Sequence, residues 1–298
     1  MSKQLKQTLC CGLIIFFSLS HPAGAEPTLT MAYMFDAEPQ MWVENGVARG
    51  IEPEIAQYIC DQLGIKVVHE FYPWARAQEM VKSGKADAMF TTPTAIRFQY
   101  AAFGRENMLP CYWNLFIRKG NRQLAEDIKK FTRLEDLKPY NLVDFIGNGW
   151  TAAFMKKEDG YNIHFVSRLE QLPEMVALGR ADLTINGSDF MRWWAAKKGV
   201  ADQIEEHNIE WPWTRFHYVF MVSRKSPWLK KGLVRAFDNE IRKMKESGIW
   251  QEILKKYKNP YGLGEPFTTM LDAEYARQGG FYDQYDRYPI YVPTSEGH

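Results

Sequence analysis

Two hydrophobic spacings alternate along most of the chain. Between residues 51 and 63, apolar side chains stand at every fourth position, and Gly64 follows them. This spacing predicts an amphipathic helix that ends at the glycine. Short apolar runs between such segments predict strands. The full set of predicted strands covers residues 29–33, 65–71, 87–90, 141–146, 164–166, 181–185 and 216–222. The predicted helices cover residues 51–63, 75–83, 150–157, 170–178, 229–247 and 249–257.

The alternation of strands with helices predicts parallel strand pairing and an α/β layer. The pattern occurs twice. The segment 84–87, Gly-Lys-Ala-Asp, and the segment 179–182, Gly-Arg-Ala-Asp, both end a predicted helix and lead into a strand. With two copies, we expect two similar lobes rather than a solenoid of stacked repeats.

The N-terminus has the pattern of a secretory signal peptide. Lys3 and Lys6 precede an uncharged apolar run over residues 9–19, and a small-residue site ends at Ala25. The run is too short for a membrane anchor, which needs about 20 residues. We therefore expect residues 1–25 to be a signal peptide, with cleavage near Ala25 and export of the remainder. A buried N-terminal helix is the alternative.

Composition excludes several classes of protein. The 298 residues are 46% hydrophobic, which is too much for a disordered chain. Lys and Arg number 37 against 36 Asp and Glu, so the chain lacks the basic surplus of a nucleic-acid binder. Aromatic residues make up 14%, and such rings line many ligand clefts. Residues 260–298 are rich in Tyr and are expected to wrap around a lobe.

Chemical motifs are few. After residue 25 only Cys60 and Cys111 remain, either as a disulfide or as two buried thiols. The six His residues lack metal-ligand spacing, and no nucleophile or phosphate-binding motif is present. We expect no metal and no cofactor.

Five segments together resemble a known family. They cover residues 50–56, 83–88, 94–97, 178–182 and 246–257. Their order is similar to that of the extracellular solute-binding proteins of family 3, which serve polar amino-acid ABC transporters. The resemblance implies an α/β, two-lobed periplasmic binding protein-like II fold, with a mixed sheet flanked by helices in each lobe and two hinge strands. It places lobe 1 at residues 26–116 plus 213–298 and lobe 2 at residues 117–212.

The resemblance also implies a carboxylate site on lobe 1. Arg97 matches the family's Arg that clamps the ligand carboxylate, for which a planar guanidinium is well suited. Thr92 matches an amide and hydroxyl donor. The stretch here is about two residues shorter, so Thr91 is the alternative candidate for this role. Thr94 is expected to cap the following helix. A solvent-exposed helical residue is the alternative for Arg97.

On lobe 2 the resemblance implies donors at a helix start. Gly149, Trp150 and Thr151 match a loop whose free amides point at an anionic group. At the position where the family holds the ligand ammonium with an Asp, this chain has Gly187. Asn186 and Asp189 are the nearby substitutes.

Four aromatic or basic side chains complete the predicted site. Tyr33 or Phe35 substitutes for an aromatic that the family places near Ala37. Trp74 and Arg76 follow a strand, where open α/β sheets bind ligands; the alternative is that Trp74 packs within the lobe and Arg76 is solvated. The remaining tryptophans of this region are expected in packing or at the hinge: Trp113, Trp193, Trp194, Trp211 and Trp213.

The function implied is that of a monomeric periplasmic protein. It would capture a small carboxylate-bearing ligand, an amino acid or a relative, by hinge closure and deliver it to an inner-membrane ABC permease. One alternative is a sensor that reports to a membrane receptor. The other is an exported cyclohexadienyl dehydratase-like enzyme, for which Glu38, Asp144 and Asp189 are the candidate acids.

Overall fold

The structure is a computed structural model that describes residues 28–257 apart from residues 210, 212 and 213. The predicted signal peptide, Trp213 and the aromatic segment 260–298 lie outside the described residues. Within the described part no helix is both long and apolar enough to span a membrane.

Thirteen strands occur in the described part of the chain, and most belong to one extended sheet. Their bounds are β1 (Thr28–Met34), β2 (Asp36–Ala37), β3 (Met41–Glu44), β4 (Val47–Arg49), β5 (Lys66–Tyr72), β6 (Ala88–Thr91), β7 (Ala101–Phe103), β8 (Leu109–Arg118), β9 (Asn141–Phe145), β10 (Asn162–Val166), β11 (Leu183–Gly187), β12 (Ile204–His207) and β13 (Arg215–Ser223). The large sheet has the order β10-β9-β11-β8-β13-β6-β1-β5, with β12 on β8 and β7 on β13. Strands β2, β3 and β4 form a small separate sheet.

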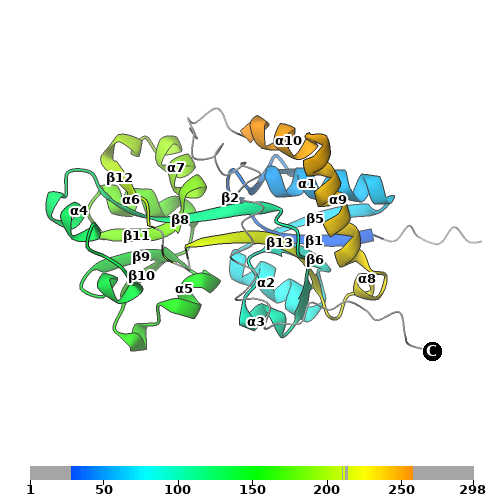
Figure 1. Cartoon of the computed structure of the whole chain (residues 1–298), viewed down its shortest axis with the longest axis horizontal. Coiled ribbons are helices and arrows are strands. Elements are labelled where there is room, and N and C mark those ends of the chain that lie inside the picture. Colours follow the sequence, from blue (N-terminus) through cyan, green and yellow to red (C-terminus); the bar gives the residue numbers. More distant parts are fainter. Residues whose placement is uncertain (1–27, 210, 212–213, 258–298) are drawn as a thin grey trace, which may run out of the picture.

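Helices cover both ends of this sheet. Their bounds are α1 (Ile51–Leu63), α2 (Trp74–Ser83), α3 (Ala95–Phe98), α4 (Arg122–Ile128), α5 (Gly149–Phe154), α6 (Leu172–Ala177), α7 (Ser188–Lys197), α8 (Pro227–Lys230), α9 (Leu233–Ser247) and α10 (Ile249–Tyr257), with 3₁₀ turns η1 (Leu134–Leu137), η2 (Lys157–Asp159), η3 (Leu169–Gln171) and η4 (Ala201–Gln203). Figure 1 shows two lobes. The first lobe contains β1–β7, α1–α3 and α8–α10, and the second contains β9–β12 and α4–α7.

Two long strands join the lobes. Strand β8 pairs with β13 through residues 109–112 and with β11 and β12 through residues 113–118. Strand β13 continues into the first lobe, where residues 219–223 pair with β6 and β7. The two strands cross the middle of the molecule side by side (Figure 1). The lobe boundaries predicted at residues 116 and 213 therefore fall in β8 and just before β13.

Most predicted elements occur within a few residues of their expected places, and strands of one lobe pair in parallel as predicted, such as β1 with β5 and β9 with β10. The predicted helix 229–247 is broken at Gly232, whose positive φ of 73° separates α8 from α9. Helix α7 was not predicted. Seven of its ten residues are buried, including Phe190, Trp193 and Trp194, so its sequence lacks a clear polar face.

The repeated tetrapeptides have the same structural role in each lobe. Asp87 Oδ2 accepts a hydrogen bond of 2.9 Å from the amide of Thr30, and Asp182 Oδ2 accepts one of 2.7 Å from the amide of Asn141. The amides of Asp87 and Asp182 donate back to the carbonyls of Thr30 and Asn141. Each Asp directly precedes one strand and is hydrogen-bonded to a residue near the start of the neighbouring strand.

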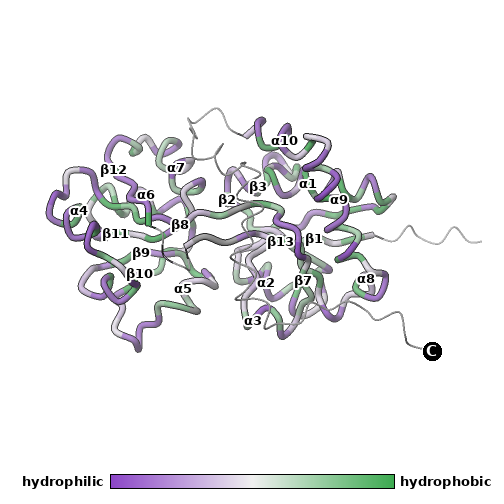
Figure 2. The backbone as a smooth tube through the Cα atoms, in the orientation of Figure 1, coloured by the Kyte–Doolittle hydropathy of each residue, from purple (hydrophilic) through white to green (hydrophobic). Residues whose placement is uncertain are grey.

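The core consists of apolar faces from the sheet and the amphipathic helices, and along α1 and α9 hydrophobic and hydrophilic residues alternate (Figure 2). Phe220 of β13 and Phe237 of α9 are fully buried, and their rings stack with centroids 3.7 Å apart. Cys60 and Cys111 are buried free thiols, so the structure has the thiols rather than the disulfide.

Phe237→Ala is expected to lower the free energy of unfolding by about 3–5 kcal/mol, because it removes a fully buried ring and leaves a cavity. Denaturant titration of the protein measures this change. Ile96→Ala, at a side chain that is 60% exposed, is the control and should change stability by less than about 0.5 kcal/mol. Similar small losses for both variants would contradict this packing.

Candidate functional site

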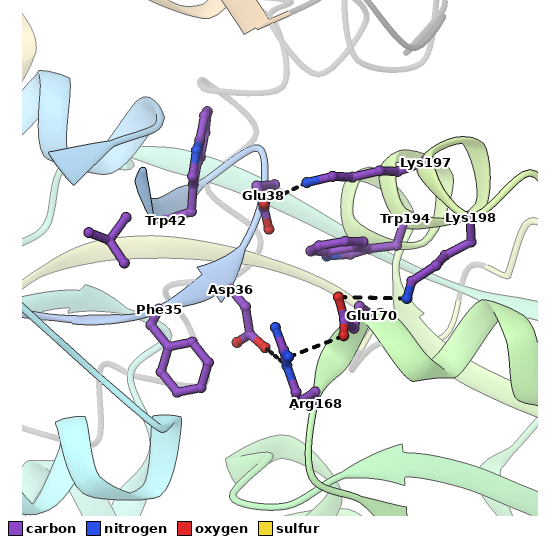
Figure 3. Close-up of a pocket in the computed structure, with 10 residues that line it drawn as sticks. Phe35, Asp36, Glu38, Trp42, Arg168, Glu170, Trp194, Lys197 and Lys198 are labelled. Atoms are coloured by element: carbon purple, nitrogen blue, oxygen red, sulfur yellow. Dashed lines mark hydrogen bonds and ion pairs between the residues drawn. The ribbon is translucent and has the colours of Figure 1, made fainter. Parts of the chain in front are cut away.

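Two ion pairs connect the lobes across the cleft. Arg168, which follows β10 in the second lobe, donates from Nε to Asp36 Oδ2 at 3.0 Å. Lys197, the last residue of α7, donates from Nζ to Glu38 Oε1 at 3.1 Å. Figure 3 shows both acids on one side and both bases on the other. The first lobe therefore presents acids to this part of the cleft, and the second lobe presents cations.

The fold explains why Asp36 and Glu38 lie here. Both follow β1, at the carboxyl end of a strand that pairs in parallel with β5 and β6, and such edges bind ligands in open α/β sheets. Both side chains are buried. Burial raises the pKa of each carboxyl group, and the hydrogen bond from Arg168 or Lys197 opposes that rise.

A pocket of about 500 Å³ lies between these walls (Figure 3). Volumes of this size are typical of small-molecule sites, and three aromatic rings contribute to its lining. The lining residues are Phe35, Asp36, Glu38, Trp42 and Val43 of the first lobe and Arg168, Glu170, Trp194, Lys197 and Lys198 of the second lobe.

Further contacts hold the pocket's cations in place. Lys197 Nζ lies 4.5 Å from the centre of the Trp194 ring. Arg168 lies 5.9 Å from the centre of the Phe35 ring and also pairs with Glu170 at 3.4 Å. Lys198 pairs with Glu170 at 3.7 Å. The cations of the second lobe are thus held in place by one aromatic ring from each lobe and by Glu170.

Arg97, the predicted carboxylate clamp, is buried on α3 and is not part of the pocket lining. The N-terminal cap of α3 is Thr94, as predicted. The Thr94 hydroxyl accepts a hydrogen bond from the Arg97 amide at 3.3 Å. The guanidinium donates from Nη1 to the carbonyl of Thr92 at 2.7 Å and from Nε and Nη2 to Gln78 Oε1 at 3.3 and 3.0 Å. It also lies 5.5 Å from the centre of the half-buried Trp74 ring.

The glycine loop of the second lobe packs directly on this group. Gln78 Nε2 donates to the carbonyl of Gly147 at 3.2 Å. A Cβ added to Gly149 would lie 3.0 Å from Arg97 Nη2, so only a glycine allows this approach without displacement. Gln78 thus receives two N–H groups of Arg97 on one oxygen and links the first lobe to the second through its amide nitrogen.

Asp144 organises the polar residues of the second lobe. Its carboxylate accepts hydrogen bonds from the Thr151 hydroxyl, from Asn148 Nδ2 at 2.8 Å and from Asn186 Nδ2 at 3.3 Å. It also accepts from the Phe145 amide at 2.8 Å. Burial nevertheless raises the pKa of Asp144 to about 6. Thr151 and Asn186 are therefore engaged with this acid.

Asp189 lies in a second buried polar group between the lobes. Its carboxylate accepts a hydrogen bond from Gln40 Nε2 of the first lobe. Burial, together with the charge of Asp189, raises the pKa of Glu52 on α1 well above its usual value. Both Glu52 carboxyl oxygens are buried and have no hydrogen-bond partner among the described residues. Asp189 thus connects the lobes through Gln40 and is not part of the pocket lining.

The other predicted site residues do not lie together in one site. Tyr33 is fully buried against Phe71, with ring centroids 5.2 Å apart, whereas Phe35 lines the pocket. Arg76 is exposed on α2. Trp150 packs on Trp113 with centroids 4.9 Å apart. Thr91, another predicted site residue of the first lobe, is buried at the end of β6.

Seven pocket residues were missed from the sequence: Asp36, Trp42, Val43, Arg168, Glu170, Lys197 and Lys198. Asp36 follows the first predicted strand, so the strand-end rule applied to Trp74 would also have indicated it. Arg168 and Lys197 carry no such signal, because single cations at the ends of elements are common on surfaces. Trp194 was expected at the hinge or in packing, and it lines the pocket.

One family model matches most of the chain. A family model described as bacterial extracellular solute-binding proteins, family 3, matches residues 29–260. No curated protein sequence matches the chain. Among the described residues, no group of three or more His, Cys, Asp or Glu side chains is placed to hold a metal ion.

Solved structures share the fold at low sequence identity. An ancestral arginine-binding protein bound to arginine is 19% identical, with a TM-score of 0.64, and the match covers 78% of this chain and 98% of that one. The substrate-binding protein of an amino acid ABC transporter is 17% identical, with a TM-score of 0.61 and coverage of 77% and 98%. A histidine kinase sensor domain with similarity to periplasmic binding proteins is 15% identical, with a TM-score of 0.64 and coverage of 77% and 95%.

Asp144→Asn is expected to change how stability depends on pH. The folded pKa of Asp144, about 6, exceeds the ordinary value of 3.8, so between these values the folded protein binds the proton more tightly than the unfolded chain. Its contribution to stability therefore falls as pH rises from about 4 to about 6. Relative to the variant, the wild type should lose about 3 kcal/mol over this range.

Denaturant titrations at pH 4, 5, 6 and 7 measure this difference. Asp202→Asn, at an exposed position, is the matched control and should run parallel to the wild type. Parallel curves for Asp144→Asn as well would show that the Asp144 carboxyl is not buried as described.

Proposed function

The chain belongs to the bacterial extracellular solute-binding proteins, family 3, and from this we propose that it captures a small amino-acid-type solute between its two lobes. The proposal places the protein in the periplasm as a monomer that delivers the solute to an inner-membrane ABC transporter. Structural neighbours that bind arginine or serve an amino acid transporter support the amino-acid class.

The observation that carries this proposal is the pocket between the lobes. Residues of both lobes line it, and ion pairs of 3.0 and 3.1 Å join its walls. A solute held there would contact both lobes at once. Such a ligand favours the closed arrangement, because it binds that arrangement more tightly than one in which the walls are apart.

Hinge motion is a further part of the proposal. Strands β8 and β13 connect the lobes, and bending of these strands would separate Asp36 from Arg168 and Glu38 from Lys197. Both acids are buried and carry raised pKa values, so opening the cleft would return them to water and relieve their desolvation. This relief would offset part of the cost of breaking the two ion pairs, which favours a cleft that can open to release its solute.

Arg97 as a carboxylate clamp stays a prediction. It is outside the pocket lining, but its position between Trp74 of the first lobe and the start of α5 in the second supports a role near the solute. In this structure Gln78 Oε1 accepts from the same guanidinium. A solute carboxylate would therefore have to displace Gln78 in order to bind there.

An exported dehydratase-like enzyme is the second candidate. Glu38, Asp144 and Asp189 are all buried with raised pKa values, a common property of catalytic acids. A similar structure is an ancestral amino acid-binding protein described as a precursor of cyclohexadienyl dehydratase, 20% identical with a TM-score of 0.61. Each acid here has its own hydrogen-bond donors in a different part of the cleft, which favours the binding role.

A thermal-unfolding screen of the chain from residue 26 tests the proposed function. The panel contains the twenty amino acids, short peptides, small carboxylates and amines, with glucose as an uncharged control. A true solute at a hundred times its dissociation constant should add about 2.7 kcal/mol of stability and raise the midpoint by about 5–10 °C. The proposal fails if no amino acid or peptide raises the midpoint more than glucose does.

A further inference from the structure

We propose that the pocket between the lobes binds a zwitterion with an aromatic body, oriented with its ammonium toward Asp36 and Glu38 and its carboxylate toward Arg168 and Lys197. This inference rests on the proposed function and specifies the solute class and its orientation. The orientation is the opposite of that implied by Arg97, which would place the carboxylate on the first lobe.

The charge distribution of the walls supports a zwitterion. The first lobe contributes Asp36 and Glu38 to the lining, and the second lobe contributes Arg168, Lys197 and Lys198 together with one acid, Glu170. The lining thus holds three acids and three bases, and the facing walls differ in sign. A ligand with a single charge would leave this balance uneven, whereas a zwitterion can place one charge against each wall.

The pairing of Glu38 is incomplete in a way that fits a ligand ammonium. Its Oε1 accepts from Lys197, but its Oε2 is buried and has no hydrogen-bond partner among the described residues. A buried carboxylate oxygen without a donor is costly. An ammonium has three N–H donors, so it can satisfy this oxygen and also contact Asp36.

The rings and the volume indicate the body of the ligand. Phe35 and Trp42 come from the first lobe, and Trp194 comes from the second. Aromatic side chains are attracted to other rings through offset-stacked and edge-to-face contacts. The volume of about 500 Å³ suits a large amino acid or a dipeptide better than a small amino acid.

The contacts of Arg97 explain why the carboxylate is assigned to the other wall. Gln78 Oε1 accepts from Arg97 Nε and Nη2 at 3.3 and 3.0 Å, as one oxygen of a carboxylate would. The Gln78 amide nitrogen then donates to Gly147 of the second lobe at 3.2 Å. The protein itself therefore fills the guanidinium side that a ligand carboxylate would take. Arg168 and Lys197 also have acid partners, but their side chains are 47% and 42% exposed, so the N–H donors that these ion pairs leave over can face a ligand carboxylate.

Calorimetry with three zwitterions tests the class: L-phenylalanine, L-tryptophan and glycyl-L-phenylalanine. We expect at least one to bind. For L-phenylalanine, 3-phenylpropionate lacks the ammonium and 2-phenylethylamine lacks the carboxylate; the corresponding analogues are used for the other two. Each analogue should bind at least about tenfold more weakly than its parent. The inference is overturned if either analogue binds as well as its parent.

Variants test the orientation with the same zwitterion. Arg168→Gln should weaken binding about tenfold, because it removes the cation assigned to the carboxylate. Lys243→Gln, at an exposed charge on α9 that is not part of the pocket lining, should change affinity less than twofold. Arg97→Gln should have a smaller effect than Arg168→Gln. Thermal unfolding without ligand confirms that each variant is folded, and Arg168→Lys is the second variant, expected to retain part of the affinity.

The outcomes separate the inference from the proposed function. If other amino acids bind but none of the three aromatic zwitterions does, the inference is wrong and the proposed function stands. If Arg97→Gln abolishes binding while Arg168→Gln leaves it unchanged, the orientation is wrong and the solute site lies at Arg97. If no member of the wider panel binds, both are wrong.

Discussion

The pairing of β8 with β13 is the constraint on which the rest of the structure depends. Residues 109–112 of β8 lie against residues 215–218 of β13, and each strand then continues into a different lobe. The two lobes therefore face one another across this connection. The contents of the cleft depend on the side chains that project from the facing strand ends and helix ends. The pocket and the inter-lobe ion pairs both follow from this arrangement (Figure 1).

Electrostatics at the walls turn this geometry into a site for a solute. Asp36 and Glu38 are buried, so each carries a desolvation cost that its partner, Arg168 or Lys197, offsets only in part. Groups in that state gain most from an additional charged or hydrogen-bonding ligand. Gln78 already accepts from Nε and Nη2 of the buried Arg97, whereas the partly exposed Arg168 and Lys197 keep further N–H donors beyond their ion pairs.

The sequence predicted the fold well because helix and strand periodicity and glycine stops are local signals. The first predicted helix, residues 51–63, has the bounds of α1, and the Asp87 and Asp182 repeats occupy equivalent positions. The site was predicted less completely. Gln78 and Arg168 act through partners 19 and 132 residues away, and no spacing in the sequence relates them to Arg97 or Asp36.

A crystal structure of the chain with its tightest-binding aromatic zwitterion tests most directly where the solute lies and how it is oriented between the lobes. We expect density for the ligand between the lobes, beside Phe35 and Trp194. Its ammonium should lie at Asp36 and Glu38 and its carboxylate at Arg168 and Lys197, with Gln78 still bound to Arg97. A carboxylate on Arg97 with Gln78 displaced, or a ligand outside the cleft, would contradict it.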